Sequence, residues 1–219
     1  MQRLLESEGF QSLSPQLKVA LFMGSLALIG SALVTLTAFT RIVIVLSFVR
    51  RALSTQEIPP TPVLLGLAMF LTLFVMGTTF SKIESEAVLP YLDGTITGDV
   101  AWDRGAGAMR TFMLAQTRKS DLSLFVELSG MQTIETIDDT PLRVLVPAFV
   151  TSELKTAFIM GFCLYLPFVL VDLVVSVILM SLGMMMMPPV VISTPFKILL
   201  FVLVDGWQLI ARAVSASFY

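Results

Sequence analysis

The residues of this sequence that could take part in chemistry are the ionisable side chains that interrupt its long apolar runs. They are Glu153, Lys155, Asp172, Lys197, Asp205 and Arg212. Charged groups inside membrane segments are costly, and they usually face other protein or a water-filled path. Three roles fit them: ion pairs that orient helices, contacts between subunits, or a path for ions or protons. The residue types alone leave all three open.

Two of these charges require partners that the local sequence does not supply. Glu153 and Lys155 are two residues apart, which on a helix turns their side chains about 200° away from each other, so they cannot pair. Lys197 falls in the first turn of a predicted helix, where a cation opposes the helix dipole. Each of these charges therefore predicts a partner from elsewhere in the fold or from another subunit.

Familiar catalytic and metal-binding patterns are missing from the sequence. It has no histidine and a single cysteine, Cys163, within an apolar run. Asp172 and Asp205 occur as LVDLV and LVDGW, which lack the GxGD pattern of intramembrane aspartyl proteases. No GxxxxGK[ST] phosphate-binding loop is present. We therefore expect no enzymatic activity, no metal and no cofactor.

A run of four methionines, followed at once by two prolines, is the most unusual stretch. It reads GMMMMPP over residues 183–189. Methionine is unbranched, apolar and deformable, and the prolines end any helix there. Arranged in a ring, such side chains could form a gasket that blocks ions but yields to a passing chain. The simpler interpretation is a hydrophobic helix end in which methionine fills gaps.

The composition requires an apolar environment around most of the chain. Of 219 residues, 56% are hydrophobic and 14% are charged, with a mean hydropathy of +0.88. Soluble domains are about 45–50% apolar and about 25% charged. The chain is therefore a membrane protein or a subunit buried against partners. Its net charge of −2 gives no basic stripe for nucleic acid.

Four apolar segments predict an all-α fold of two hydrophobic helical pairs. They are Val19–Thr40, Val63–Phe80, Val146–Met187 and Pro195–Ala216. The first continues to Val49, and a straight helix of that length would measure about 46 Å, beyond a hydrocarbon core of about 30 Å. We expect it to break or to end inside protein. The second is expected to start near Pro62, and the last with Thr194 as its N-cap.

A polar insert separates the two hydrophobic pairs. Residues 82–143 hold 16 of the 30 charged residues, ten acidic and six basic. Apolar spacing around Met109–Leu114 and Leu122–Leu128 predicts two short amphipathic helices, ended by Gly130, with residues 134–141 as a loop. We accordingly divide the chain into residues 1–81, 82–145 and 146–219.

Basic residues between the first two segments predict the orientation in the membrane. Arg41, Arg50 and Arg51 cluster there, and the positive-inside rule assigns that loop to the cytoplasm. The polar insert and both termini would then face outwards, towards the periplasm. The N-terminal residues lack a basic stretch followed by an apolar stretch and a small-residue cleavage site, so we expect a loose or amphipathic lead-in and no cleavable signal peptide.

Several ordered blocks resemble the FliP family. They are AFTRIVIVLSFVR (38–50), PPTPVLLGLAMFLT (59–72), FMLAQTRKSDLSLF (112–125), TSELKTAF (151–158), GMMMMPP (183–189) and PFKILLFVLVDGW (195–207). The similarity covers nearly the whole chain. VLVDGWQL and FMLAQTR are closer to the flagellar branch than to the related injectisome subunits. Flagellar relatives often carry a cleavable signal peptide, which we do not find here.

The resemblance implies a subunit of a type III protein export gate in the bacterial inner membrane. Members form a pentamer that joins FliQ-like and FliR-like subunits in a helical cone standing largely on the periplasmic side, and they work with FlhB-like and FlhA-like export components of the flagellar basal body. Unfolded secreted proteins pass through the pore. The resemblance assigns the constriction to Met184, Met185 and Met186, with Met187 as a less regular member. It assigns Glu153 and Lys197 to buried contacts between subunits, and Arg118 to a neighbour's Glu153.

Two other functions stay open on the residues alone. An ion-coupled transporter or channel would use Asp172, Lys197 and Asp205, and it predicts that neutralising Asp172 abolishes ion flux while assembly survives. A membrane scaffold without a pore predicts that replacing the methionines by glycine changes no permeability. An equivalent subunit of a virulence injectisome is the alternative within the family.

Overall fold

The computed structural model describes residues 14–55, 57–130, 140–184 and 187–219, and every regular element in those ranges is helical. This confirms the all-α fold class. The elements are α3 (Pro15–Leu36), α4 (Phe39–Ala52), α5 (Thr61–Val75), α6 (Gly77–Ile83), the π-helical turn η1 (Glu84–Val88), α7 (Leu89–Leu92), α8 (Gly98–Gln116), α9 (Lys119–Leu128), α10 (Leu142–Ser181), α11 (Pro189–Leu203) and α12 (Gly206–Ala216).

Two compact units make up the chain, residues 1–35 and residues 36–219. Within the first unit, α3 is a 22-residue apolar helix, long enough to cross a membrane. The predicted lead-in falls mostly on residues 1–13, outside the described residues. The expected break in the first apolar run is confirmed, because α3 ends at Leu36 and α4 begins at Phe39.

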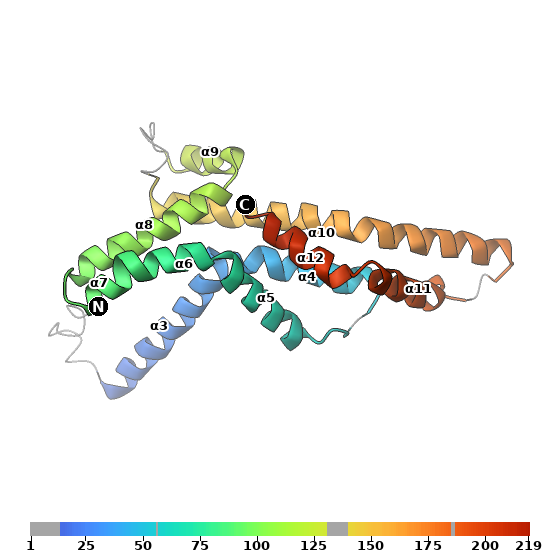
Figure 1. Cartoon of the computed structure of the whole chain (residues 1–219), viewed down its shortest axis with the longest axis horizontal. Coiled ribbons are helices and arrows are strands. Elements are labelled where there is room, and N and C mark those ends of the chain that lie inside the picture. The colour runs from blue at the N-terminus through green and yellow to red at the C-terminus, as the bar shows by residue number, and fades with distance from the viewer. Residues whose placement is uncertain (1–13, 56, 131–139, 185–186) are drawn as a thin grey trace. The chain divides into compact units, whose positions relative to one another are not determined.

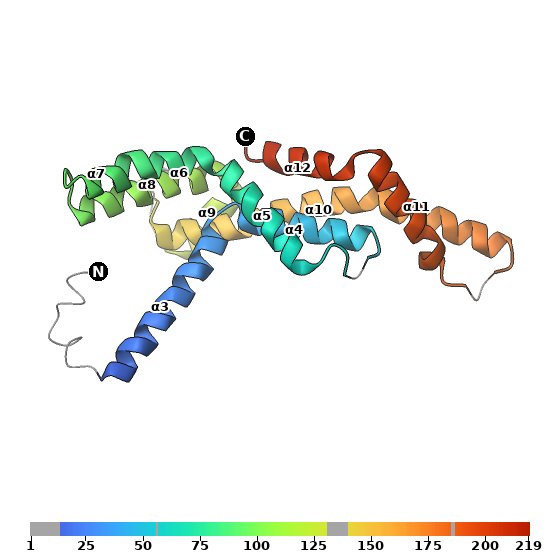
Figure 2. The same ribbon diagram turned by 60° about the horizontal axis from the view of Figure 1, so that its bottom comes forward.

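Helix α4 is the centre of the second unit. Its buried residues Ile42, Val45, Leu46 and Val49 follow the i, i+3, i+4, i+7 spacing of one helical face. That face packs mainly against α10, and α5 covers another part of α4. Figures 1 and 2 show α4 running alongside α10 from both directions. The second half of the first apolar run is therefore a core helix of this unit.

A close helix crossing holds α4 against α10. Gly161 of α10 is buried, and the ring of Phe48 lies so near that a Cβ at position 161 would overlap it. Phe48 also makes an edge-to-face contact with Phe158, one turn before Gly161 on α10, with ring centroids 5.5 Å apart. The glycine is thus required by the close approach of an aromatic ring, because its backbone φ is ordinary for a helix.

We predict that Gly161→Ala lowers the free energy of unfolding by about 1–3 kcal/mol, because the added methyl overpacks the crossing. Gly66→Ala is the matched control. Gly66 also lies inside a helix, but no atom lies within 4 Å of its ideal Cβ, so this change should be neutral or stabilise by up to about 1 kcal/mol. Thermal unfolding of the detergent-purified variants measures both. Equal effects at the two positions would contradict the packing argument.

Two helix pairs are sharply bent. The pair formed by α5 and the segment Gly77–Leu92 bends by 62°, and α11 with α12 bends by 66°. The second bend is set by Asp205, whose φ of +51° is left-handed, and by Gly206, where a Cβ would overlap the ring of Phe201. In the described residues, α3 and α10 alone are long and apolar enough to span a membrane, and counting each bent pair as one span gives up to four.

The expected helix starts were partly right. Helix α5 has Pro62 in its first turn, as predicted. The prediction for the last segment was wrong: α11 begins at Pro189, and Thr194 lies inside it, where its hydroxyl donates to the Val190 carbonyl at 2.7 Å. Pro195 lies in the interior of α11, beyond its first turn, where its missing N–H removes one intrahelical hydrogen bond.

The two amphipathic helices predicted in the polar insert are present as α8 and α9, but α8 is longer than predicted, because it begins at Gly98 rather than near Met109. Gly130 has φ +67° directly after α9, which confirms it as a stop. Most of the predicted loop at 134–141 lies outside the described residues. The third apolar helix starts at Leu142 and continues unbroken past Pro147 and Pro167 to Ser181. Figures 1 and 2 show α6 and α8 side by side.

Candidate functional site

The most buried charges of the chain form an ion pair between α4 and α10. The side chain of Arg41 is 2% exposed and that of Glu153 is fully buried. Arg41 Nε donates to Glu153 Oε2 at 2.8 Å, and Arg41 Nη2 donates to Glu153 Oε1. Such two-pronged pairing matches the planar guanidinium to the carboxylate. It supplies the partner that Glu153 required, from the same chain.

The last residues of the chain complete this pair, and we call the group Arg41, Gln116, Glu153 and Ser217 the Arg41 cluster. Arg41 Nη1 donates to the Ser217 carbonyl at 2.8 Å and to Ser217 Oγ at 3.0 Å, and Arg41 Nη2 donates to Gln116 Oε1 at 3.1 Å. The Phe218 ring lies 3.8 Å from the guanidinium carbon. The guanidinium thus meets several acceptors and one aromatic face, which offsets the cost of burying it.

The expectation that Arg41, Arg50 and Arg51 lie in a loop is wrong, because all three belong to α4. Arg41 lies in the core, whereas Arg51 is exposed and Arg50 donates to Thr61 Oγ1 at 2.9 Å. The orientation in the membrane stays a prediction. The sequence did carry a signal. Arg41 stands alone between two apolar runs, and on a helix it shares a face with Ala38, Val45 and Ala52, which are all buried. A cation on an apolar face predicts a buried acid.

A second buried ion pair joins α10 to α11. Lys197 Nζ donates to Asp172 Oδ2 at 2.6 Å and to Ser54 Oγ at 2.7 Å, and the Lys197 side chain is 2% exposed. Ser193 Oγ donates to Asp172 Oδ1 at 2.5 Å. The acid expected beside Lys197 is thus Asp172, 25 residues earlier. Because α11 begins at Pro189, Lys197 lies two turns into the helix, and the argument from the helix dipole does not apply to it.

The ion pair with Lys197 gives Asp172 a structural role, so we expect its neutralisation to affect stability. Its carboxylate is 29% exposed and accepts from both Lys197 and Ser193. We predict that Asp172→Asn lowers the free energy of unfolding by about 2 kcal/mol, because it leaves the Lys197 ammonium buried without an anion. Asp205→Asn, at an exposed acid in the bend before α12, should change stability little. Thermal unfolding checks both, and loss of ion flux with unchanged stability would instead favour an ion path.

The remaining predicted charges lie on the surface. Lys155, Asp205 and Arg212 are exposed. Arg118 immediately precedes α9; its backbone N–H donates to Ser152 Oγ at 3.0 Å, and its guanidinium donates to Thr156 Oγ1 at 3.3 Å. In the described ranges, Arg118 forms no ion pair with Glu153. The assignment of Arg118 to the Glu153 of a neighbour stays a prediction.

The methionine run forms the connection between α10 and α11. Gly183, with φ +73°, follows the helix end, and the Met184 N–H donates to the Leu179 carbonyl at 3.0 Å, which closes the helix in the manner expected of a C-terminal glycine. Met184 and Met187 are each 41% exposed. Met185 and Met186 lie outside the described residues. Pro188 immediately precedes α11, so the connection is short and fixed at both ends.

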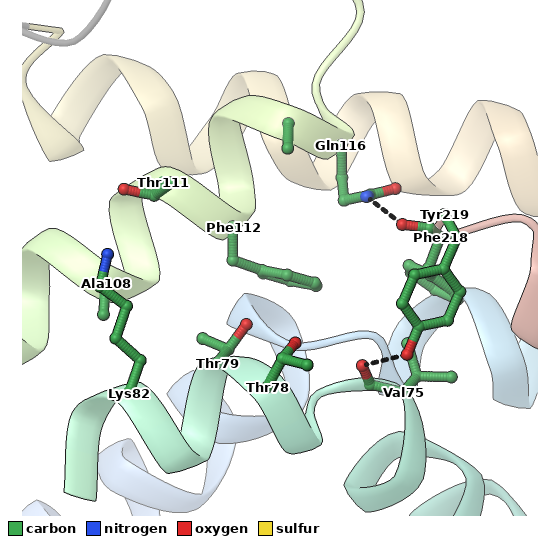
Figure 3. Close-up of a pocket in the computed structure, with 11 residues that line it drawn as sticks. Val75, Thr78, Thr79, Lys82, Ala108, Thr111, Phe112, Gln116, Phe218 and Tyr219 are labelled. Atoms are coloured by element: carbon green, nitrogen blue, oxygen red, sulfur yellow. Dashed lines mark hydrogen bonds between the residues drawn. The ribbon is translucent and has the colours of Figure 1, made fainter. Parts of the chain in front are cut away.

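A shallow groove of about 300 Å³ lies between α6, α8 and the C-terminal residues. Figure 3 shows Thr78, Thr79 and Lys82 on one side and Phe112 on the other. Gln116 Nε2 donates to the Phe218 carbonyl at 3.0 Å, and Tyr219 Oη donates to the Val75 carbonyl at 3.3 Å, so the chain's last residues form one wall. The groove offers hydroxyls, three aromatic rings and one cation, which do not form an acid–base pair. Within residues 14–55, 57–130, 140–184 and 187–219, no cluster of three or more metal-ligating acids or cysteines occurs.

These features define a class of protein: a helical membrane protein that buries two ion pairs within its described residues, while its longest helices expose apolar side chains. The comparison with protein families is more specific. The FliP family model matches residues 22–214, and the chain belongs to the FliP family.

Relatives along nearly the whole length support this assignment. The chain is 51% identical over 211 residues to the flagellar biosynthetic protein FliP of Pectobacterium carotovorum, covering 96% of this chain and 82% of the relative. It is 48% identical over 215 residues to the flagellar biosynthetic protein FliP of Bacillus subtilis, covering 98% and 97%. The corresponding protein of Aquifex aeolicus is 42% identical over 212 residues. The resemblance found in the sequence blocks is confirmed.

Proposed function

We propose that this chain is a pore-forming subunit of the bacterial flagellar type III protein export gate. It is part of the flagellar export apparatus and lets unfolded proteins cross the inner membrane. The observation that carries the proposal is the family match over residues 22–214. It is supported by two relatives named as flagellar biosynthetic proteins, to which the chain is 51% and 48% identical. These names favour the flagellar branch over an injectisome. The role is structural, with the energy for transport supplied by other components.

Assembly with other subunits fits the surface of the chain. Apolar side chains are widely exposed along α10 and α11, among them Phe162, Leu173, Val202 and Leu203. A single copy cannot bury them, so lipid or neighbouring subunits must cover them. We propose a pentamer of this chain that joins FliQ-like and FliR-like subunits and works with FlhB-like and FlhA-like components. Much of the assembly would stand on the periplasmic side of the inner membrane, in the flagellar basal body.

The methionine connection is the proposed constriction. Met184, Met185, Met186 and Met187 sit between two long apolar helices, at a connection fixed by Gly183 and Pro188. In a ring of copies, a short connection of this kind would repeat around a central axis. Flexible thioether side chains could close the opening to ions and still deform around a polypeptide.

The charges proposed for subunit contacts divide into two kinds. Glu153 and Lys197 are neutralised within the chain, so we propose that they shape the helices that neighbours pack against. Arg118 has a neutral acceptor, Thr156, and is half-buried at the start of α9. It is therefore the one of the three that is available to a neighbouring copy. Pairing with a neighbour's Glu153 would require that carboxylate to be shared with Arg41.

Native mass spectrometry tests this function. The full chain is purified in detergent, alone and after co-expression with its neighbouring membrane subunits. We expect a pentamer that gains FliQ-like and FliR-like partners. A monomer or dimer under both conditions would overturn the ring and favour an ion-coupled transporter.

A further inference from the structure

One end of the helical hairpin formed by α6–α7 and α8 has a surface suited to binding protein. Between residues 84 and 104, the sequence holds five acidic residues and one basic residue, Arg104. The same stretch exposes Leu92 by 72% and Trp102 by 75%. Large exposed apolar side chains mark interaction sites, and tryptophan is a frequent anchor in them. We call Leu92, Asp93, Asp99, Trp102 and Asp103 the hairpin tip.

A surface of opposite charge lies beyond the other end of α8. Arg118 is held against α10 by its contacts with Ser152 and Thr156. Lys119 follows Arg118, and Lys155 precedes Thr156, and both lysines are exposed. The two ion pairs found in the described ranges involve other residues. We call Arg118, Lys119 and Lys155 the cationic patch.

Apolar surface continues from this patch along α10. Phe158 is 56% exposed and Ile159 is 50% exposed, and Ile159 follows Lys155 by one helical turn. The cationic patch and the hairpin tip therefore both combine exposed apolar side chains with charges of one sign, and the sign is positive on the patch and negative on the tip.

The tip and the patch of one chain cannot meet. Asp99, Trp102 and Asp103 of the tip lie near the start of α8 (Gly98–Gln116), and Arg118 follows the end of this helix. The 15 residues from Asp103 to Arg118 correspond to about 22 Å of helix. Figures 1 and 2 show α7 at one end of α8 and α9 at the other. A contact between the two surfaces therefore requires two molecules.

We propose that the hairpin tip of one copy docks on the cationic patch of the next copy of this chain. The occupant is a second copy because the chain itself carries both complementary surfaces. Trp102 and Leu92 would lie against the apolar surface of α10, and the tip aspartates would face Lys119 and Lys155. Such a contact joins different surfaces of the two partners, so successive copies continue in one direction, and they form a ring when the rotation between copies closes. This inference deepens the proposed function and rests on it.

Disulfide cross-linking tests the contact directly. Val100→Cys and Ser120→Cys place thiols beside the tip and the patch, in a Cys163→Ser background of the full chain co-expressed with its membrane partners. Both positions are exposed, and in one chain they are far beyond the Cα separation of about 4.4–6.8 Å that a disulfide allows. We expect a ladder of cross-linked multimers on non-reducing gels. The control pair Val100→Cys and Glu57→Cys should give none.

Charge reversal tests the same contact without cysteines. We expect Lys119→Glu with Lys155→Glu to weaken assembly about tenfold, as expected for several exposed charge pairs turned repulsive. Adding Asp99→Lys and Asp103→Lys should restore it. Glu57→Lys is the control, because it changes charge at an exposed site that belongs to neither surface, and it should leave assembly unchanged.

Two results would overturn the inference in different ways. A chain that forms its pentamer, yet cross-links no better through Ser120 than through Glu57, excludes this contact and leaves the proposed function standing. A chain that forms no oligomer overturns both. Rescue of the reversed lysines by the reversed aspartates supports the contact, whereas assembly that is unaffected by either reversal contradicts it.

Discussion

Arg41→Met is expected to destabilise the chain by about 3–5 kcal/mol, the largest loss among the single changes considered. It leaves the Glu153 carboxylate buried without a counter-charge, and breaking a buried pair from one side has this cost. The change also removes the donors to Gln116 and to the Ser217 carbonyl and the cation beside Phe218. Thermal unfolding in detergent, followed by the fraction of protein recovered as folded oligomer, measures the loss.

The double variant separates charge from packing. Arg41→Met with Glu153→Met replaces both ions by apolar groups, and such replacements are often neutral or stabilising. We expect it to recover much of the stability lost in Arg41→Met. Arg212→Met removes an exposed arginine from α12 and should have little effect. A double variant as unstable as the single one would show that the Arg41 cluster acts through its contacts with the C-terminal residues and not through the buried charge of Glu153.

The segments of this fold were predictable because each carries a local signal. The length of the apolar runs predicts the hydrophobic helices, and amphipathic spacing predicts α8 and α9. The first apolar run is too long for one straight helix across a membrane, which predicts the break before α4. These signals depend on residues within a few turns of one another. The bends between helices were harder to predict from the sequence. The one before α12 depends on Asp205 in a left-handed conformation and on Phe201 lying against Gly206, a contact that spacing does not specify.

The partners of the buried charges could not be derived from the sequence. Glu153 pairs with Arg41 across 112 residues, and Lys197 pairs with Asp172 across two helices. The sequence correctly required a partner for each, because an unpaired buried charge is too costly. It could not choose the partner, because that choice depends on which helix faces pack together. Arg41, which the sequence analysis used to predict the membrane orientation, is the residue that pairs with Glu153 when α4 packs against α10.

The methionine connection carries the second large expected effect. Replacing Met184, Met185 and Met186 by glycine should raise the ion leak of cells that assemble the gate, because three deformable apolar side chains per copy are removed from the proposed constriction. Hydrophobic constrictions exclude ions by dewetting, and a wider opening loses that property. Membrane potential and sodium or proton uptake in cells that express the assembled complex measure the leak.

A leucine variant separates the effect of the size of the methionine side chains from the effect of their flexibility. Replacing the same three residues by leucine keeps the apolar volume but loses the flexible thioether. We expect this variant to stay tight to ions and to export protein more slowly, whereas the glycine variant leaks and continues to export. Native mass spectrometry should show the same assembly for both, since Met184 is partly exposed and contributes little to the core. If the glycine variant exports normally with an unchanged ion leak, the methionines do not seal the pore, and the connection is an ordinary helix end.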